Sequence, residues 1–430
     1  MKTLTYLKQL FFLLCFAALT VSCSSSDSPA PTPVDTKPTI SSFSPQSASL
    51  GSTLTIIGTN FSTTAANNVV TINGVTATVT AATATQLTVT VPACSGTGVI
   101  KVSIGGNAAS SSSLFTFIST VFAGGNSQGQ YASGVLWKDG KQNAIFKNDP
   151  SGIVINGITY IDTDQYACGN FGNTACYWKN GNQINLSVPA NYTSGATSIF
   201  VSGTDVYISG FVKGPYSPKN PAYWKNGVLT IITSTYANSE ANSIFVVGND
   251  VYAAGYITSV TTGGAIAYYW KNQEVPVALT TNRGTTSSEA KSIFVSNGIV
   301  YVAGWEGEFI NNSPVTTSVA KLWKNGTPQS LSNGNFDANA NFVTVDGSDI
   351  YVGGDDNNVA TVWKNGTPTK LSNIVSSINV LYLKGTDIYS GGYESRGSTV
   401  VGTIWKNGVN YQTLEGESGN SSVVNSIYVK

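Results

Sequence analysis

The sequence predicts an all-β protein, and three features lead to that prediction. Charged residues make up only 10% of the 430 residues, while Gly, Ser, Thr, Asn and Val are abundant, a composition typical of strands and turns. One phrase, an apolar residue followed by Trp-Lys-Asn-Gly or a close variant, occurs seven times. The tryptophans of successive copies lie 41, 46, 46, 53, 40 and 42 residues apart. A period of about 40–50 residues in a strand-rich chain is typical of β-propeller blades.

The repeated phrase has a physical explanation. An apolar pair ends a strand, and Asn-Gly or Asp-Gly then forms a type I′ hairpin turn, which needs positive φ at both central residues. The seven tryptophans are Trp137, Trp178, Trp224, Trp270, Trp323, Trp363 and Trp405. We expect them to pack in the core, with each indole N–H bonded to backbone. We expect the lysines that follow to lie at the surface beside Asp205, Asp250, Asp349 and Asp387.

One repeat reads as a four-stranded meander, which is one propeller blade. In residues 198–232, strands at 198–201 and 206–210 are followed by a loop, a strand at 222–225, the Asn-Gly turn and a strand at 228–232. The propeller begins at 121–125, which matches a second strand, and the sequence ends at 426–430, which matches a first strand. We therefore predict that the C-terminal strand completes the first blade and closes a seven-bladed ring, residues 119–430.

The N-terminal segment reads as an export signal. Lys2 and Lys8 precede an apolar run at 10–21 that is too short to span a membrane comfortably. The run ends Thr20-Val21-Ser22-Cys23, which resembles a bacterial lipobox, so residues 1–22 would be removed and Cys23 lipidated. Ser24 is not the Asp that retains lipoproteins at the inner membrane, and the resemblance implies an outer-membrane anchor. The alternative is a soluble secreted protein cleaved near Ser22.

Two units follow the cysteine before the propeller. Residues 23–38 are polar and proline-rich, as in a flexible tether. Residues 39–118 alternate apolar residues between Gly, Asn and Pro turns, which predicts a small antiparallel β-sandwich. Their phrases SSFSP, GTNF and INGV, and a strand ending in VP, resemble the IPT/TIG immunoglobulin-like family. The resemblance implies a spacer or interaction module. We expect Cys94 there to be a single buried thiol.

Two cysteines in the second repeat raise the question of a disulfide. Cys168 and Cys176 flank a short loop, and if Tyr166 faces Trp178 across the hairpin, Cys168 faces Cys176. An exported protein permits a disulfide. The sequence therefore leaves open a cross-strand bridge or two buried thiols.

The loops indicate where a ligand could bind. Turns between strands one and two and between strands three and four are short and uniform, and they share one face of the ring. Loops between strands two and three, and between blades, vary in length and open on the opposite face, where binding usually resides. Aromatic and acidic residues suited to sugar rings and hydroxyl groups occur there: Phe211, Tyr256, Trp305, Glu306, Asp355, Tyr393 and Glu394. The alternative is that the aromatic rings cap the spaces between blades.

Composition excludes several functions. The chain has no histidine, which excludes His-based triads, His general bases and His-ligated metals. It has 22 basic and 22 acidic residues, so a nucleic-acid partner is not expected. We find no catalytic motif and expect no cofactor and no metal.

We therefore predict a monomeric, non-enzymatic cell-envelope lipoprotein that touches the membrane only through its anchor and binds a glycan or another extracellular ligand. One alternative is a structural or adhesion module that binds a protein. The other is a glycan-cleaving enzyme that uses a carboxylate pair such as Glu306 and Asp355.

Overall fold

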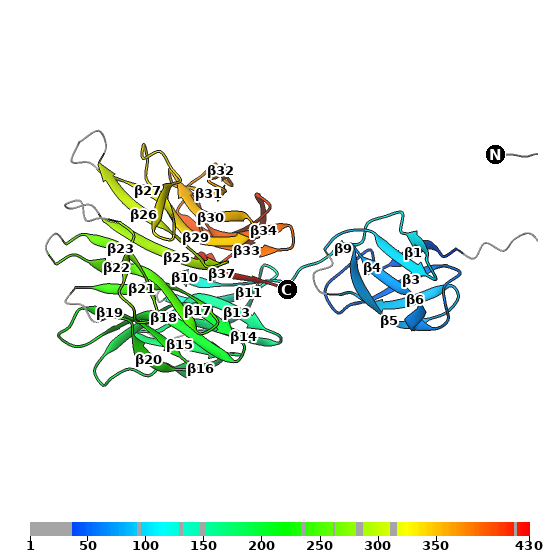
Figure 1. Ribbon diagram of the computed structural model, residues 1–430, viewed down its shortest axis with the longest axis horizontal. Helices are drawn as coiled ribbons and strands as arrows, with labels where there is room; N and C mark the ends of the chain where they lie inside the picture. The colour runs from blue at the N-terminus through cyan, green and yellow to red at the C-terminus, as the bar shows by residue number, and fades with distance from the viewer. Residues whose placement is uncertain are drawn as a thin grey trace, which may run out of the picture.

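The computed structural model describes residues 37–92, 96–128, 132–146, 152–233, 237–260, 263–280, 287–309, 316–416 and 419–430. The expected export signal, Cys23, most of the tether and Cys94 lie outside these ranges. The described chain is all-β apart from one short 3₁₀ turn, Ala65–Asn67. Figure 1 shows a small β-unit joined by a short connection to a ring of sheets.

The small unit is a seven-stranded sheet with one parallel strand pair beside it. The sheet order is β1 (Thr39–Ser44), β3 (Thr53–Thr59), β6 (Gln86–Thr90), β5 (Val75–Ala82), β4 (Val69–Ile72), β7 (Ile100–Ile104) and β8 (Asn107–Ser110). The parallel pair is β2 (Ser47–Ala48) with β9 (Thr116–Phe117). Buried and more exposed residues alternate along β3. Leu54, Ile56 and Phe115 are fully buried in one apolar core, so the unit has a core of its own.

The remainder forms seven four-stranded antiparallel sheets, the blades of a propeller. Blade 1 has β12 (Lys141–Phe146), β11 (Ala132–Lys138), β10 (Val121–Gln128) and β37 (Ser421–Val429). Blade 2 has β13 (Ile153–Ile161), β14 (Asp164–Phe171), β15 (Thr174–Lys179) and β16 (Asn182–Asn185), and blade 3 has β17 (Thr193–Ser202), β18 (Asp205–Lys213), β19 (Lys219–Lys225) and β20 (Val228–Ile231). Blade 4 has β21 (Ser239–Val247), β22 (Asp250–Thr258), β23 (Ala265–Lys271) and β24 (Val277–Ala278), and blade 5 has β25 (Ser288–Ser296), β26 (Ile299–Phe309), β27 (Thr316–Lys324) and β28 (Thr327–Ser330). Blade 6 has β29 (Ala338–Asp346), β30 (Asp349–Asp356), β31 (Val359–Lys364) and β32 (Thr367–Lys370), and blade 7 has β33 (Ser376–Lys384), β34 (Asp387–Arg396), β35 (Thr399–Lys406) and β36 (Val409–Leu414).

The predicted closure of the ring is confirmed. Strand β37 pairs with β10 from Val121–Val429 to Gln128–Ser421. Thr120 and Lys430 extend this pairing, since each donates its N–H to the other's carbonyl at 3.1 and 2.9 Å. The C-terminal strand therefore supplies the innermost strand of the blade that the N-terminal part of the propeller leaves incomplete.

The repeated turn builds one surface structure, which we call the turn cluster. In blade 3, Lys225 forms an ion pair with Asp205 at 2.9 Å, and Asn226 donates from Nδ2 to the same carboxylate at 2.8 Å. Asn226 Oδ1 also accepts the N–H of Val206 at 2.9 Å, while its φ is +52°. Corresponding ion pairs occur in blades 2, 4, 6 and 7: Lys179–Asp164, Lys271–Asp250, Lys364–Asp349 and Lys406–Asp387. The surface location expected for these lysines and aspartates is confirmed.

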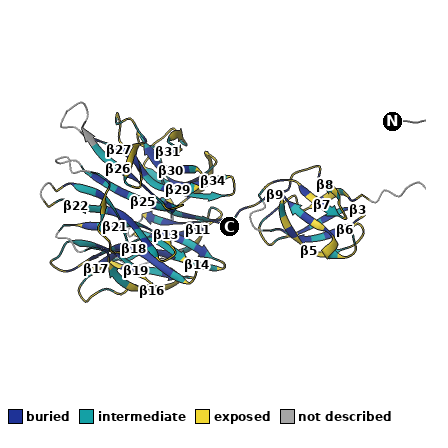
Figure 2. Ribbon diagram, in the orientation of Figure 1, coloured by how far each residue is buried: buried dark blue, intermediate teal, exposed yellow. Residues whose placement is uncertain are grey.

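The repeated tryptophans are buried as predicted, but their hydrogen bonding differs from expectation. The longest buried runs lie on the second and third strands of a blade, as in β30 and β31, while the outermost strand β32 is exposed; Figure 2 shows the buried residues in dark blue within the sheets of the ring. Trp137 and Trp224 donate Nε1–H to the carbonyls of Glu415 and Ser187. Four indole N–H groups have no acceptor within bonding distance among the described residues, which contradicts the prediction for them: Trp270, Trp323, Trp363 and Trp405. These four stabilise the blades through burial of the indole rings, and Trp270 also stacks on Tyr268.

The structure contradicts the disulfide between Cys168 and Cys176, because both thiols are free and buried. The assumed hairpin register is wrong by one residue, since Tyr166 lies opposite Lys179 rather than Trp178. Cys168 therefore lies opposite Tyr177, and its thiol packs in a different apolar cluster from that of Cys176. Burial raises the pKa of Cys176 to about 12 and that of Cys168 further, so both are core residues.

The small unit enters the propeller from the face of the short turns. Residues 118–120 connect β9 to the start of β10, and that end of β10 lies beside the last residue of β37. Figure 1 shows the connection and the C-terminus together on the side nearest the small unit. The variable loops therefore open on the face turned away from it.

Candidate functional site

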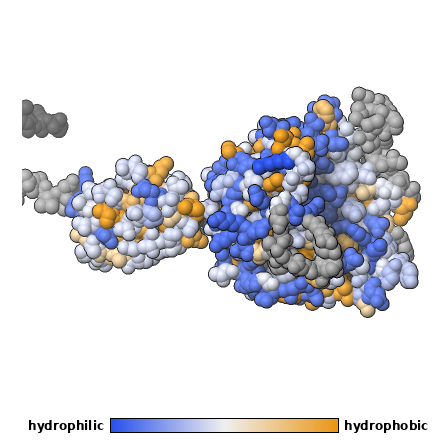
Figure 3. All heavy atoms as spheres, turned by 180° about the vertical axis from the view of Figure 1, so that it is seen from behind, coloured by the Kyte–Doolittle hydropathy of each residue, from blue (hydrophilic) through white to orange (hydrophobic). Residues whose placement is uncertain are grey.

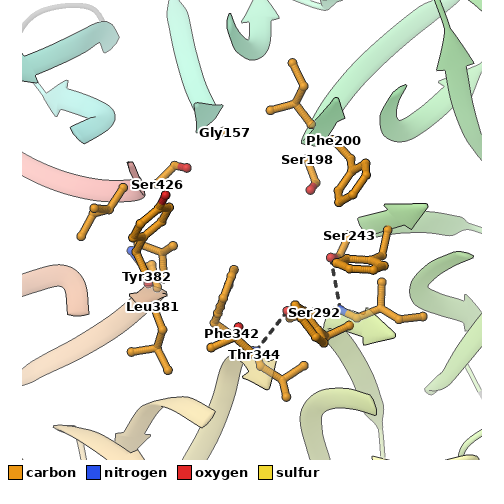
Figure 4. A pocket seen from close by; sticks show the side chains of 18 of the residues that line it. Gly157, Ser198, Phe200, Ser243, Ser292, Phe342, Thr344, Leu381, Tyr382 and Ser426 are labelled. Atoms are coloured by element: carbon orange, nitrogen blue, oxygen red, sulfur yellow. Dashed lines mark hydrogen bonds between the residues drawn. The ribbon is translucent and has the colours of Figure 1, made fainter. Parts of the chain in front are cut away.

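A cavity of about 750 Å³ runs along the centre of the ring. It is lined by the seven innermost strands: β37, β13, β17, β21, β25, β29 and β33. Figure 4 shows Ser198, Ser243 and Ser292 ranged around its open centre on neighbouring strands. The volume lies within the range of small-molecule sites. None of the seven ligand-binding residues expected from the sequence lines this cavity.

Each innermost strand carries a β-bulge at the same position. The residues at the bulges are Asn425, Asn156, Thr197, Asn242, Lys291, Asn341 and Asn379, and all seven line the cavity. Six of them donate a side-chain hydrogen bond to the next blade, to the carbonyl that precedes its bulge; the acceptors, starting from Asn425, are Ile155, Ala196, Ala241, Ala290, Ile378 and Val424. We call this circle of contacts the bulge ring.

Lys291 is the exception in the bulge ring. Its ammonium turns to Glu289 on its own strand, at 2.7 Å, and no bond from it to Ala340, the corresponding carbonyl of blade 6, is present. The side chain of Lys291 is 35% exposed and that of Glu289 is 19% exposed. Glu289 also accepts a hydrogen bond from Asn242 at 2.8 Å. Blade 5 therefore places an ion pair where the other blades place an amide or a hydroxyl.

Below the bulge ring the cavity becomes more aromatic. Ser243 and Ser292 accept the N–H groups of Ile293 and Val343 in the next blade, each at 3.2 Å, and Figure 4 shows both bonds as dashed lines. Phe200, Phe245 and Phe294 follow, with ring centroids 4.8 and 4.7 Å apart. Tyr382 and Tyr428 contact each other at 5.3 Å on the far side. The cavity thus combines polar groups at the level of the bulges with aromatic rings nearer the face of the short turns, where Asp346 and Gly385 also line it.

A network of charged and aromatic residues lies beside the rim on blades 3 to 5. Lys219 Nζ lies 3.9 Å from the centroid of the Phe211 ring and 2.9 Å from the carboxylate of Glu240. Tyr256 lies directly opposite Glu240 in the pairing of β21 with β22. We call Phe211, Lys219, Glu240, Tyr256, Glu289 and Lys291 the rim cluster. All six lie in the part of their strands that is nearer the face of the variable loops.

The rim cluster is electrostatically balanced. Two lysines face two glutamates, in the pairs Lys219–Glu240 and Lys291–Glu289. Burial, and then the neighbouring carboxylates of Glu240 and Glu289, raise the pKa of Tyr256 to about 12. Its hydroxyl, protonated at neutral pH as tyrosines ordinarily are, can donate a hydrogen bond to Glu240.

The structure divides the residues expected from sequence into two groups. Phe211 and Tyr256 belong to the rim cluster, and Trp305 lies opposite Glu289 across the β25–β26 pairing. These three rings are half-buried. In blades 1 and 2 the position of these rings is occupied by Asn126 and Asn170. Their side-chain oxygens accept backbone N–H groups of the next blade, at 2.9 and 2.8 Å. The position thus faces the joint between blades, and the rings lie over that joint.

The expected acidic residues have partners within the protein. Asp355 is buried and accepts hydrogen bonds from Ser377 and Asn339, and burial raises its pKa. Glu306 lies 3.5 Å from the buried Lys321. Glu394 is buried and bonded to Ser372 and Arg396. Tyr393 is half-buried, and burial followed by the charge of Asp355 raises its pKa.

Sequence reasoning missed four members of the rim cluster. Glu240 and Glu289 stand at the same place in two neighbouring repeats, SEANSIFV and SEAKSIFV. Comparison of the repeats position by position would have revealed these acids, and would have shown Lys291 in place of Asn242. Lys219 has no such signal, because it begins a third strand after a loop of variable length.

The described residues contain no group of three or more acidic or sulfur side chains that could hold a metal ion. In the described part of the chain, no helix is long and apolar enough to cross a bilayer. On the face seen in Figure 3, hydrophobic residues lie singly or in small groups among hydrophilic ones.

Comparison with known proteins identifies one domain. Residues 38–117 match the IPT/TIG domain family. No curated protein matches the chain. A solved protein of unknown function from Bacteroides thetaiotaomicron VPI-5482 is 12% identical and has a TM-score of 0.45, with 92% of this chain and 98% of that chain covered.

Two other solved structures are similar over most of their length. An auxiliary nutrient binding protein from Bacteroides thetaiotaomicron VPI-5482 is 15% identical with a TM-score of 0.31, covering 78% of this chain and 85% of that one. The polysaccharide lyase Uly1 is 11% identical with a TM-score of 0.42, covering 72% and 87%. The chain is thus an IPT/TIG domain followed by a seven-bladed β-propeller that its C-terminal strand closes.

Proposed function

We propose that this chain is a lipid-anchored protein of the bacterial cell envelope that binds a glycan at the rim cluster. The observation that carries the proposal is the contact of Phe211, Lys219 and Glu240 with Tyr256, Glu289 and Lys291, of which Lys291 also lines the central cavity. Aromatic faces, carboxylates and ammonium groups in one place suit a ligand that has both apolar faces and hydroxyl groups.

The balance of charge favours a ligand without net charge. Glu240 and Glu289 can accept hydrogen bonds from hydroxyl groups, while Lys219 and Lys291 can donate to them. Because the two pairs cancel, the rim has no excess charge with which to attract an ionic ligand over long range.

The direction of the anchor supports the same face. The IPT/TIG domain, and the tether before it, join the propeller at the start of β10, on the face of the short turns. The rim cluster lies at the opposite ends of the strands. A chain anchored through Cys23 would therefore present the rim cluster away from its membrane.

Protein binding is the second candidate function. The same face carries exposed apolar side chains in its loops, of which Tyr216 is fully exposed and Phe336 is 56% exposed. Such side chains can anchor a protein partner. Catalysis by Glu306 and Asp355 is less well supported, because Lys321 pairs with the first and Ser377 and Asn339 bond the second.

A glycan array with the mature chain, run beside a pull-down from envelope extract, tests the proposal. We expect binding to neutral glycans on the array. Captured protein with a blank array would favour the second candidate, and release of sugar from polysaccharide would favour the enzyme.

The anchor is tested separately by Cys23→Ala. This variant should leave the membrane fraction and lose labelling by a fatty-acid probe, since it removes the residue that would be lipidated. A variant that stays membrane-bound and labelled would refute the lipobox interpretation.

A further inference from the structure

The bulge ring bridges six of the seven junctions between blades in the described chain and is open between blades 5 and 6. Five of its members are Asn and one is Thr, and each reaches the same carbonyl of the next blade. Lys291 stands at the seventh position and bonds Glu289 instead. Among the described residues, Lys291 is therefore the one bulge residue whose side chain bonds within its own strand instead of reaching the next blade.

We propose that Lys291 and Glu289 form the pair that selects the ligand, and that they recognise two adjacent hydroxyl groups of a neutral sugar at the entrance to the central cavity. This inference rests on the proposed function and assigns its specificity to one blade. Lys291 lines the cavity, and Asn242, also in its lining, bonds Glu289.

The hydrogen-bonding capacity of the pair fits adjacent hydroxyl groups. Lys291 has three N–H donors, and the described residues provide Glu289 as its single partner. Glu289 receives Lys291 on Oε2 and Asn242 on Oε1, and each carboxylate oxygen retains a further lone pair. One sugar hydroxyl can therefore accept from the ammonium while its neighbour donates to the carboxylate, with the ion pair intact.

The surroundings of the pair disfavour an acidic ligand. The carboxylate of Glu289 lies 2.7 Å from the ammonium of Lys291, so a ligand carboxylate attracted to Lys291 would also come close to Glu289. Glu240 of the neighbouring blade adds a second negative charge to the rim cluster. Two carboxylates at such a short distance repel each other strongly. A neutral sugar meets no such repulsion, and deeper in the cavity Phe245 and Phe294 offer aromatic surface.

The variant Lys291→Asn separates ligand recognition from stability. It places in blade 5 the residue that five other blades use, and the new amide can donate to the carbonyl of Ala340. We expect a melting temperature equal to or above that of the native chain. We expect binding to neutral hexose oligosaccharides, measured on the array and by titration calorimetry, to fall about 10-fold or more, the loss of one charge-assisted contact.

A second variant tests the charge argument. Glu289→Gln keeps the shape and an acceptor for Asn242, but leaves Lys291 without a counter-charge. We expect it to gain binding to uronic-acid oligosaccharides relative to matched neutral ones. Lys364→Asn, which removes a lysine from the opposite face, is the matched control and should change neither preference.

Three results would overturn the inference. If Lys291→Asn binds neutral oligosaccharides as well as the native chain does, Lys291 does not contact the ligand, and the proposed function is unaffected. A native chain that prefers uronic-acid to neutral oligosaccharides would refute the charge argument. If the native chain binds no glycan at all, the proposed function fails together with this inference.

Discussion

The face of the short turns and the rim of the central cavity are made from the same seven repeats. The residues at equivalent positions are nearly the same on the first and differ more on the second. The turn cluster has the same ion pair in five blades. At the rim, the position two places before the bulge holds five different residue types in the seven blades: Val423, Val154, Gly195, Glu240, Glu289, Asn339 and Ser377. Positions that are the same in most blades serve the folding of each blade. Variation at equivalent positions is where a ligand can be specified.

The ring itself is the first part of this comparison to break. Deletion of residues 426–430 removes Ile427 and Val429, buried residues of β37, and leaves the first half of β10, residues 121–124, without partners on that edge. We expect aggregation or a large loss of thermal stability, because an open sheet edge pairs with other chains. Calorimetry and size-exclusion chromatography would measure it, and a truncated chain that melts like the full one would contradict closure.

Two tryptophans sharpen the comparison between core and rim. Trp224 is fully buried and donates to Ser187, so Trp224→Ala should cost about 3–5 kcal/mol of unfolding free energy. Trp305 is half-buried beside the rim cluster. Trp305→Ala should cost less stability and weaken glycan binding by roughly 1–3 kcal/mol.

Denaturant melts and titration of both variants give the two quantities. Lowered melting without a change in binding would assign Trp305 to the joint between blades.

The smallest expected effect concerns Asp355. Burial raises its pKa in the folded state, so the unfolded chain loses this proton first as pH rises. Its contribution to stability therefore falls as pH increases from the ordinary carboxyl pKa of about 4 to the higher folded value, and then stays level.

The variant Asp355→Asn should lack that decrease. Its melting temperature, compared with that of the native chain across this range, should rise with pH. A difference that stays constant with pH would show that Ser377 and Asn339 offset the burial fully.

The fold could be predicted from sequence because each blade repeats its own signals. The Trp-Lys-Asn-Gly turn fixes one hairpin, and the incomplete repeats at 121–125 and 426–430 indicate how the ring closes. The cross-strand register of Cys168 could not be predicted this way, since a shift of one residue leaves the turn signals unchanged but moves the side chain to the other face.

The candidate site was predicted only in part for a similar reason. Phe211 and Tyr256 follow a glycine in each repeat and are visible along the chain. Their partnership with Lys219 and Glu289 depends on neighbouring blades that meet in space. The bulge that directs Lys291 toward the cavity is a local change in backbone pairing. No residue type in the sequence predicts where such a bulge occurs.

The connection at residues 118–120 also determines how the protein would respond to mechanical force. If the chain is anchored through Cys23 as we propose, a pull transmitted through the IPT/TIG domain would enter at Thr120 and act along the length of β10. Strand β10 is held on one side by β11 and on the other by β37. Hydrogen bonds perpendicular to the pull share the load and must fail together, whereas bonds at a peeled end fail one at a time. The seam of the ring is thus loaded in shear, the direction in which a sheet resists tension best.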